Sequence, residues 1–180
     1  LMLGGGVGIP PMVFLAEQLV AAGVSMENSL VLMGSEVPFP FQQTTSKISV
    51  NGLPAAASDA MPDLENINVA SRLASLQNYS GCHQGYVTDL ATEWLKSLNK
   101  EQLGEVEIFA CGPEPMLEAA AAVAKRFELP CQLCLEEYMA CAVGGCAGCS
   151  VPVYHNGEMA MKRVCVDGPV FSAASIYPDI

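Results

Sequence analysis

Four cysteines near the C-terminus have the spacing of a metal-cluster site. They are Cys141, Cys146, Cys149 and Cys165, in the pattern C-x4-C-x2-C-x15-C. The first three match the spacing that holds a [2Fe–2S] cluster when a fourth cysteine lies farther along the chain. The intervening loop is rich in glycine, which lets a backbone wrap closely around a cluster because it has no Cβ and tolerates positive φ. The pattern therefore predicts an iron–sulfur site.

A structural zinc ion is the alternative for the same cysteines. Zinc in such sites usually takes two C-x2-C pairs, and here only Cys146 and Cys149 form one. The spacing favours iron and sulfide over zinc, and a zinc-stapled interaction module remains the alternative outside enzymes.

A glycine-rich turn near the N-terminus could bind a phosphate. The segment Gly4–Pro10, GGGVGIP, follows a short apolar strand and precedes an apolar helix. In that context the backbone N–H groups and the helix N-terminus can face an anion. The glycine spacing differs from G-x-G-x-x-G, so a tight strand-to-helix turn without a ligand is the alternative.

A second short motif, Cys111-Gly112-Pro113, lies between a predicted strand and a predicted helix. Ligands of open α/β sheets bind at this end of a strand. A buried, unreactive thiol is the alternative for Cys111.

Strands and helices that alternate up to residue 129 must position these motifs. The predicted strands are 1–3, 29–33, 69–76 and 105–110, and the predicted helices are 10–22, 90–98 behind a Thr88-Asp89 cap, and 113–127. Residues 37–66 read as loops around a short strand at 47–50 and one helical turn near Leu64. The alternation predicts an α/β fold, a Rossmann-like parallel sheet with helices on both faces.

The pattern changes after Pro130. One more strand at 131–137, the cysteine loop, a hairpin about Asn156-Gly157 and a turn at 167–169 predict a small β-rich unit. We therefore expect a nucleotide-binding module at 1–130 and a cluster-binding domain at 131–180.

Composition excludes several classes of protein. Apolar residues make up 51% of the 180 residues and charged residues 15%, so the chain can bury enough surface to fold. The net charge of -11 argues against nucleic acid and anionic membranes as partners. The sequence predicts no transmembrane helix and no secretory leader, and Leu1 is not an initiator methionine. We expect further chain upstream and a cytoplasmic protein.

Five segments in this order resemble the electron-transfer subunit of two-flavin dihydroorotate dehydrogenase, within the ferredoxin–NADP reductase superfamily. They are LGGGVGIPP, GCHQGYVTDLA, FACGPEPML, LEEYMACAVGGCAGCSVPV and KRVCVDGPVF. The resemblance implies an FAD-binding barrel, an NAD-binding module and a [2Fe–2S] module. It further implies that electrons pass from dihydroorotate to FMN on a catalytic partner subunit, then through the cluster to FAD and finally to NAD.

The resemblance also implies roles for individual residues. Those lining the NAD pyrophosphate would be Gly4, Gly5, Gly6, Gly8, Ile9 and Pro10. Cys111 would be the catalytic thiol near nicotinamide and flavin, beside Gly112 and Pro113. The cluster ligands would be Cys141, Cys146, Cys149 and Cys165.

The chain departs from the family at three points. It contains no FAD barrel, so the flavin site is incomplete. Gly34-Ser35-Glu36 stands where the family usually has an arginine, and a carboxylate there suits a ribose hydroxyl, which favours NAD over NADP. Ala142 stands where the first cluster cysteine is usually followed by glycine.

The electron count requires a flavin between NAD and the cluster. A hydride carries two electrons, whereas a [2Fe–2S] cluster takes one at a time. We therefore expect this chain alone to bind a cluster but to transfer no hydride. NAD-linked subunits of hydrogenases and of ferredoxin–NADP transhydrogenases share the module order and remain the alternative among oxidoreductases.

Overall fold

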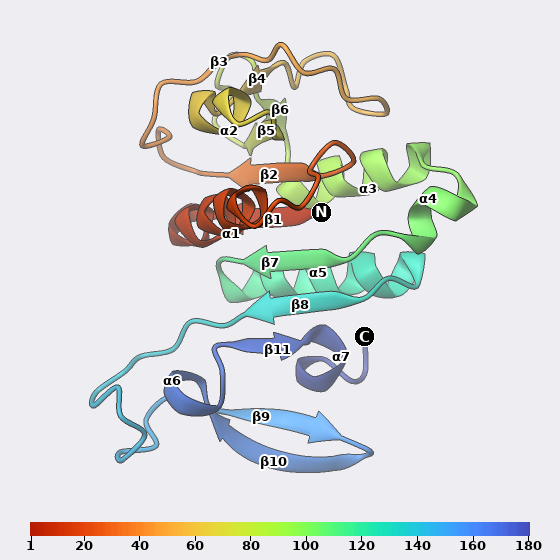
Figure 1. The fold of residues 1–180 in the computed structure, drawn as a ribbon. Helices are drawn as coiled ribbons and strands as arrows, with labels where there is room; N and C mark the ends of the chain where they lie inside the picture. Colours follow the sequence, from red (N-terminus) through yellow and green to blue (C-terminus); the bar gives the residue numbers. More distant parts are fainter.

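A seven-stranded sheet forms the centre of the computed structural model, which describes residues 1–180. In spatial order its strands are β11 (Val170–Ser172), β8 (Cys131–Cys134), β7 (Ile108–Cys111), β1 (Met2–Gly5), β2 (Leu30–Gly34), β5 (Ala70–Ser75) and β6 (His83–Gln84). All neighbours are parallel except β11, which runs antiparallel to β8. The predicted parallel sheet is confirmed (Figure 1).

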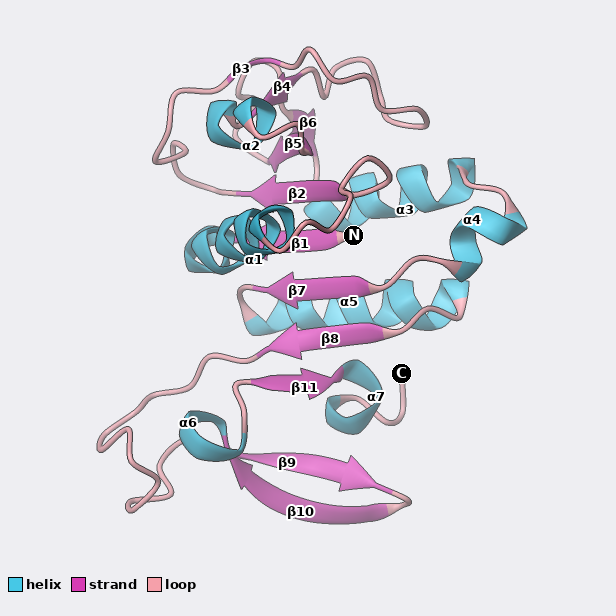
Figure 2. Ribbon diagram, in the orientation of Figure 1, coloured by secondary structure: helices cyan, strands magenta, loops and turns pink.

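Helices cover both faces of this sheet (Figure 2). The helices of the chain are α1 (Ile9–Ala21), α2 (Pro62–Asn66), α3 (Val87–Ser97), α4 (Lys100–Gly104), α5 (Glu114–Phe127), α6 (Val164–Asp167) and α7 (Ala173–Ile176), with a 3-10 turn η1 (Gly6–Gly8) before α1; α6 lies beside the β9–β10 hairpin rather than on the sheet. Successive strand residues point to opposite faces, so Met2 and Met33 pack with α1, whereas Leu3 and Leu32 pack with α3 and α5. None of the helices is long and apolar enough to cross a membrane.

The segment between β2 and β5 differs from its prediction. The short strands there are β3 (Thr44–Thr45) and β4 (Asp59–Ala60), and the strand predicted at 47–50 is wrong. Side chains bind that backbone instead: Lys47 N donates to Glu65 Oε2 at 3.0 Å, and Arg72 Nη2 donates to Ile48 O at 2.7 Å. The helical turn near Leu64 is confirmed as α2.

The start of one helix also differs, and one further short helix is present. Helix α3 begins after Tyr86 rather than after the predicted Thr88-Asp89 cap, and Asp89 Oδ2 accepts from Tyr86 N at 2.8 Å. Helix α4 was not expected, although Asn99 and Gln102 close a reciprocal capping box at its start.

The C-terminal part of the chain is tied to the main sheet at two strands. After β8 the chain forms the cysteine loop and the predicted hairpin of β9 (Ser150–His155) and β10 (Glu158–Arg163). Asn156 and Gly157 both have positive φ, which suits a two-residue hairpin turn. The chain then returns as β11 beside β8. The division at residue 130 stays a prediction, and the backbone pairing favours a division after Cys134.

Candidate nucleotide and cluster sites

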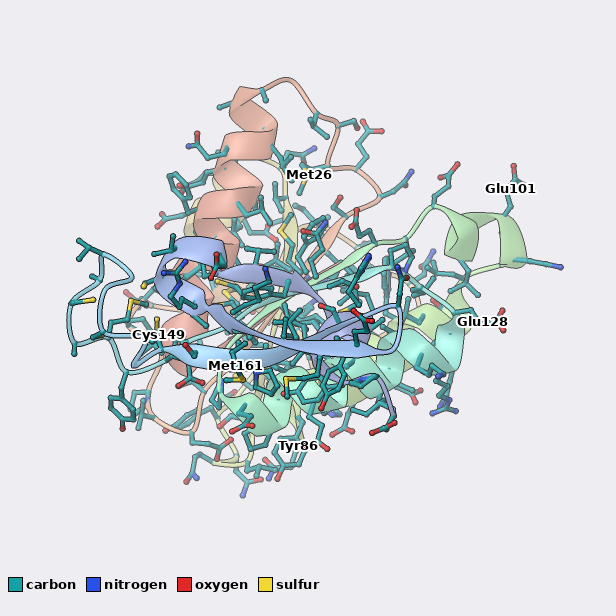
Figure 3. The ribbon with its side chains drawn as sticks, turned by 90° about the horizontal axis from the view of Figure 1, so that it is seen from below. Met26, Tyr86, Glu101, Glu128, Cys149 and Met161 are labelled. Atoms are coloured by element: carbon teal, nitrogen blue, oxygen red, sulfur yellow. The ribbon has the colours of Figure 1, made fainter.

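The carboxyl ends of the parallel strands meet at one edge of the sheet. Gly5 lies opposite Gly34, which lies opposite Ala74, while Cys111 lies opposite both Gly4 and Cys134. Figure 1 shows the arrowheads of β2, β7 and β8 at the same end of the molecule as the loop that follows β8, and β1 runs parallel to β2 and β7. In Figure 3, turned by 90°, Cys149 again lies at one end and Glu101 of α4 at the other. This edge therefore holds the glycine turn, the Cys111 motif and the cysteine loop. It is the edge at which α/β sheets bind ligands.

A pocket of about 520 Å³ opens at this edge. It is lined by Gly5, Gly6, Gly34, Ser35, Glu36, Val37, Ala74, Gly85, Tyr86, Val87, Thr88, Pro113, Pro115, Met116 and Ala119. The N-termini of α3 and α5 both reach it, which gives the pocket two helix ends of positive partial charge. Its only charged lining residue is Glu36, so the pocket fits a dinucleotide whose phosphates face backbone rather than cationic side chains.

Within the glycine turn, two glycines have different tasks. Gly6 has φ +53° and no atom within 4 Å of the place of a Cβ, so its backbone faces open space at the pocket. Gly8 is internal, because a Cβ there would lie 2.0 Å from the carbonyl oxygen of Cys111. Gly8 thus lets the start of α1 lie directly against the end of β7.

Only some of the residues that the resemblance places on the pyrophosphate line the pocket. The structure brings Gly5 and Gly6 to the pocket, together with Gly34, Glu36 and Pro113. The residues of this set that do not line the pocket are Gly4, Gly8, Ile9 and Pro10. Ile9 is a buried core residue, and Pro10 is exposed without an N–H to donate.

The lining residues with no role assigned from sequence include Gly85, Tyr86 and Thr88. They belong to the GYVTD segment, which reads equally well as a turn and a helix cap. The signal available was its position, directly after a strand end and at the start of a helix.

Glu36 is held at the rim of the pocket. Its Oε1 accepts from Leu76 N at 3.4 Å and its Oε2 from Gln77 Nε2 at 3.2 Å. A carboxylate fixed there can accept from ribose hydroxyls and repels a 2′-phosphate.

Cys111 lies behind the pocket rather than on its wall. Its side chain is 1% exposed, and the neighbouring Cys134 thiol together with burial raises the pKa of Cys111. It is therefore a protonated thiol. Gly112 and Pro113 border a second pocket of about 270 Å³, between α5 and β9, whose wall carries three carboxylates. That charge does not suit the phosphates of FAD, so the chain provides at most part of a flavin site.

The four motif cysteines lie as two pairs. Cys146 N donates to Cys141 Sγ at 3.4 Å, and the Sγ atoms of Cys149 and Cys165 lie 3.2 Å apart. The loop directs further backbone N–H groups at these sulfurs, from Gly148 to Cys146 and from Cys165 to Cys149. The arrangement favours thiolates, which are the form that binds metal.

Thiolate character follows from these donors. The N–H of Cys146 lowers the pKa of Cys141 to about 6. The N–H and the thiol of Cys165 lower the pKa of Cys149. The hydrogen bond between the two side chains in turn raises the pKa of Cys165.

The donor set fits a [2Fe–2S] cluster better than zinc. No three His, Cys, Asp or Glu side chains converge closely enough to hold one metal ion, whereas a two-iron cluster takes two protein ligands on each iron. Arg163 Nη1 donates to Gly144 O at 3.1 Å and holds the loop. Ala142 and Ala147 have φ +55° and +53°, so both lie in the region that favours glycine.

Comparison with known proteins agrees with both halves of this edge. Residues 2–122 match the family described as oxidoreductase NAD-binding domain, and residues 136–177 match the iron–sulfur cluster binding domain of dihydroorotate dehydrogenase B. The chain is 32% identical over 177 residues to the dihydroorotate dehydrogenase B (NAD(+)) electron transfer subunit of Caldanaerobacter subterraneus subsp. tengcongensis, covering 98% of this chain and 58% of that protein. It is 34% identical over 179 residues to the subunit of the same name from Bacillus caldolyticus, covering 98% and 56%.

A solved structure is similar over nearly the same extent. It is an NADH-dependent reduced ferredoxin–NADP oxidoreductase described for flavin-based electron bifurcation, with a TM-score of 0.66 and 25% identity. The match covers 97% of this chain and 52% of that one. The chain thus spans about half to three-fifths of the length of the proteins it matches.

Proposed function

Because this chain belongs to the family of oxidoreductase NAD-binding domains and continues into the iron–sulfur domain of dihydroorotate dehydrogenase B, we propose that it is the NAD- and cluster-binding part of an electron-transfer subunit. Its partner is an FMN-containing dihydroorotate dehydrogenase catalytic subunit. Electrons from dihydroorotate reach NAD through the [2Fe–2S] cluster and FAD, as a step of pyrimidine biosynthesis in the cytoplasm.

One observation carries this proposal: the paired cysteines and the 520 Å³ pocket belong to the same edge of one sheet. Strand β8, which lies next to the Cys111 strand, leads directly into the cluster loop. Because one sheet positions both, the nucleotide pocket and the cluster loop keep a fixed separation.

The chain's own residues bind and orient. Backbone N–H groups of the Gly6 turn and of the α3 and α5 N-termini receive the pyrophosphate, and Glu36 accepts from ribose hydroxyls. Cys141 and Cys146, together with Cys149 and Cys165, would supply the four thiolate ligands of the cluster. FAD, when bound, would supply the exchange between paired and single electrons, and the residues of this chain that the resemblance places near its ring are Cys111, Gly112 and Pro113.

The first test is the cluster itself. Protein purified without oxygen should contain about two irons and two acid-labile sulfides per chain. Each of the four cysteines, changed singly to serine, should lower both contents and the brown colour. A colourless preparation that holds zinc and keeps its fold in these variants contradicts the proposal.

The second test is the need for flavin. NADH added to cluster-loaded, flavin-free protein should leave the visible spectrum unchanged, because the chain has no group to divide an electron pair. Rapid bleaching under these conditions contradicts the proposed route.

A ferredoxin–NADP oxidoreductase subunit is the second candidate, and the structural similarity favours it. Nucleotide preference does not discriminate between the two, because the similar protein is itself described as NADH-dependent. The electron-transfer partner does: a stable complex with a dihydroorotate dehydrogenase catalytic subunit supports the first candidate, and a complex with a ferredoxin instead supports the second.

A further inference from the structure

Strand β8 carries two cysteines that resemble a redox motif in sequence. Cys131 and Cys134 have the C-x-x-C spacing of dithiol oxidoreductases. In a strand, however, residues three apart point to opposite faces of the sheet. Cys131 packs in the core on the α5 side, whereas Cys134 packs on the α1 side. The two thiols of the motif therefore cannot meet.

The partner of Cys134 lies on the adjacent strand. Cys111 of β7 is in register with it, and both side chains belong to the apolar core on the α1 face of the sheet. Neighbouring strands lie about 4.8 Å apart, within the span of about 4.4 to 6.8 Å between the Cα atoms of disulfide-bonded cysteines. A bond between these two sulfurs requires no movement of the sheet.

The two thiols differ in access and in acidity. Cys134 is half-buried, whereas Cys111 is almost fully buried. The hydrogen bond from Cys111 lowers the pKa of Cys134 to about 7, against the opposing effects of burial and of Glu136. Cys134 therefore has the thiolate and the exposure that an attacking thiol needs, and Cys111 is placed to resolve the product.

We propose that Cys134 and Cys111 form a reactive thiol pair that small-molecule disulfides convert into an intramolecular disulfide. Cys134 thiolate attacks one sulfur of the small disulfide, forming a mixed disulfide and releasing the first small thiolate. Cys111 loses its proton and attacks Cys134 Sγ, which forms the Cys111–Cys134 bond and releases the second small thiol. Two electrons pass from the protein to the small disulfide, and thiols reverse the exchange.

This modification goes beyond the proposed function, because it needs neither NAD nor a partner subunit. It joins β7 to β8 at the point where the chain leaves the sheet for the cluster loop. It also consumes the thiol that lies behind the nucleotide pocket.

Peptide mapping of the cluster-loaded protein tests the pair. The protein is treated with oxidised glutathione without oxygen, and its visible absorption is followed to show that the cluster remains. Digestion after glutamate residues separates peptides 108–118 and 129–136, which contain Cys111 and the β8 cysteines. We expect a disulfide between these two peptides, and dithiothreitol should remove it.

Single variants assign the bond. Cys131→Ser should keep the crosslink, and Cys134→Ser should lose it. Cys111→Ser should lose it too, but accumulate glutathione on Cys134. Cys82→Ser, at a buried thiol elsewhere in the molecule, is the matched control and should behave as the parent does.

The proposal is overturned if the Cys131→Ser protein forms no crosslink, or if the crosslink persists in Cys134→Ser. Far-UV circular dichroism and iron content are measured on every variant, so that a fault in folding or in cluster binding is seen separately from a failure of thiol exchange.

Discussion

Gly8→Ala tests the close approach between the glycine turn and the Cys111 strand. A Cβ at this position would lie 2.0 Å from the carbonyl oxygen of Cys111 and 2.6 Å from Gly112 N. Both obstacles are backbone atoms of a segment fixed by pairing on each side of β7. The turn or the strand end must therefore move by more than an ångström.

Overpacking of a well-packed interior costs about 1 to 3 kcal/mol, and a clash with paired backbone belongs at the upper end. We expect Gly8→Ala to lower the free energy of unfolding by about 3 kcal/mol, equivalent to a fall in Tm of about 6 to 12 °C for a chain of this size. Urea denaturation followed by circular dichroism measures the change. NADH affinity should fall as well, because the same shift displaces Gly112 and Pro113.

Gly6→Ala is the matched control two residues away. Its Cβ meets nothing within 4 Å, so only the positive φ opposes the change, at about 1 to 2 kcal/mol. Equal losses for Gly8→Ala and Gly6→Ala would refute the argument from close approach.

Three further predictions concern the nucleotide site, the cluster loop and the cysteines of β8. Glu36→Gln should weaken NADH binding about tenfold, because hydrogen bonds to a charged group contribute about 1.5 to 3 kcal/mol. The ratio of the NADPH and NADH dissociation constants should fall as well. Titration calorimetry with both nucleotides measures this ratio, and an unchanged ratio contradicts the role assigned to Glu36. Ala142→Gly should slow loss of iron to a chelator, since Ala142 sits at φ +55° and glycine relieves about 1 kcal/mol of strain; faster loss contradicts this. The rate at which iodoacetamide alkylates Cys134 should rise with pH and reach half its maximum near the pKa of Cys134, about 7, because the thiolate is the reacting form. Cys131, whose pKa burial raises to about 12, should stay unreactive across neutral pH. Mass spectrometry measures both rates, and equal rates at the two positions contradict the assigned environments.

Patterns that repeat over a few residues were predictable from the sequence. The alternation of apolar strands and helices yielded the parallel sheet, and Asn156-Gly157 marked the hairpin, because each depends on local periodicity or on a turn that needs positive φ. The strand predicted at 47–50 failed for the opposite reason. Its backbone partners are the side chains of Glu65 and Arg72, which are distant in sequence.

The site shows the same division. Cysteine spacing predicted the cluster loop, because its ligands lie within one short stretch. Which glycine faces the pocket and which packs on β7 depends on the register between β1 and β7, and no local pattern carries that register. Thr88 lines the pocket for a similar reason, since only folding brings the start of α3 beside Gly34.

The pairing of β8 with β11 has a consequence for how the iron–sulfur unit could be moved between proteins. Leu135 N donates to Pro169 O at 2.9 Å, so the chain leaves the sheet and comes back to it at the same point. Residues 136–168 form an insertion whose two ends are adjacent on the sheet, and Cys149 and Val164 of this insertion pack into the core of the sheet itself. A short bridge between Leu135 and Pro169 closes the connection at small entropic cost. A sheet that receives the insertion must supply two neighbouring strand ends and also an apolar surface for Cys149 and Val164.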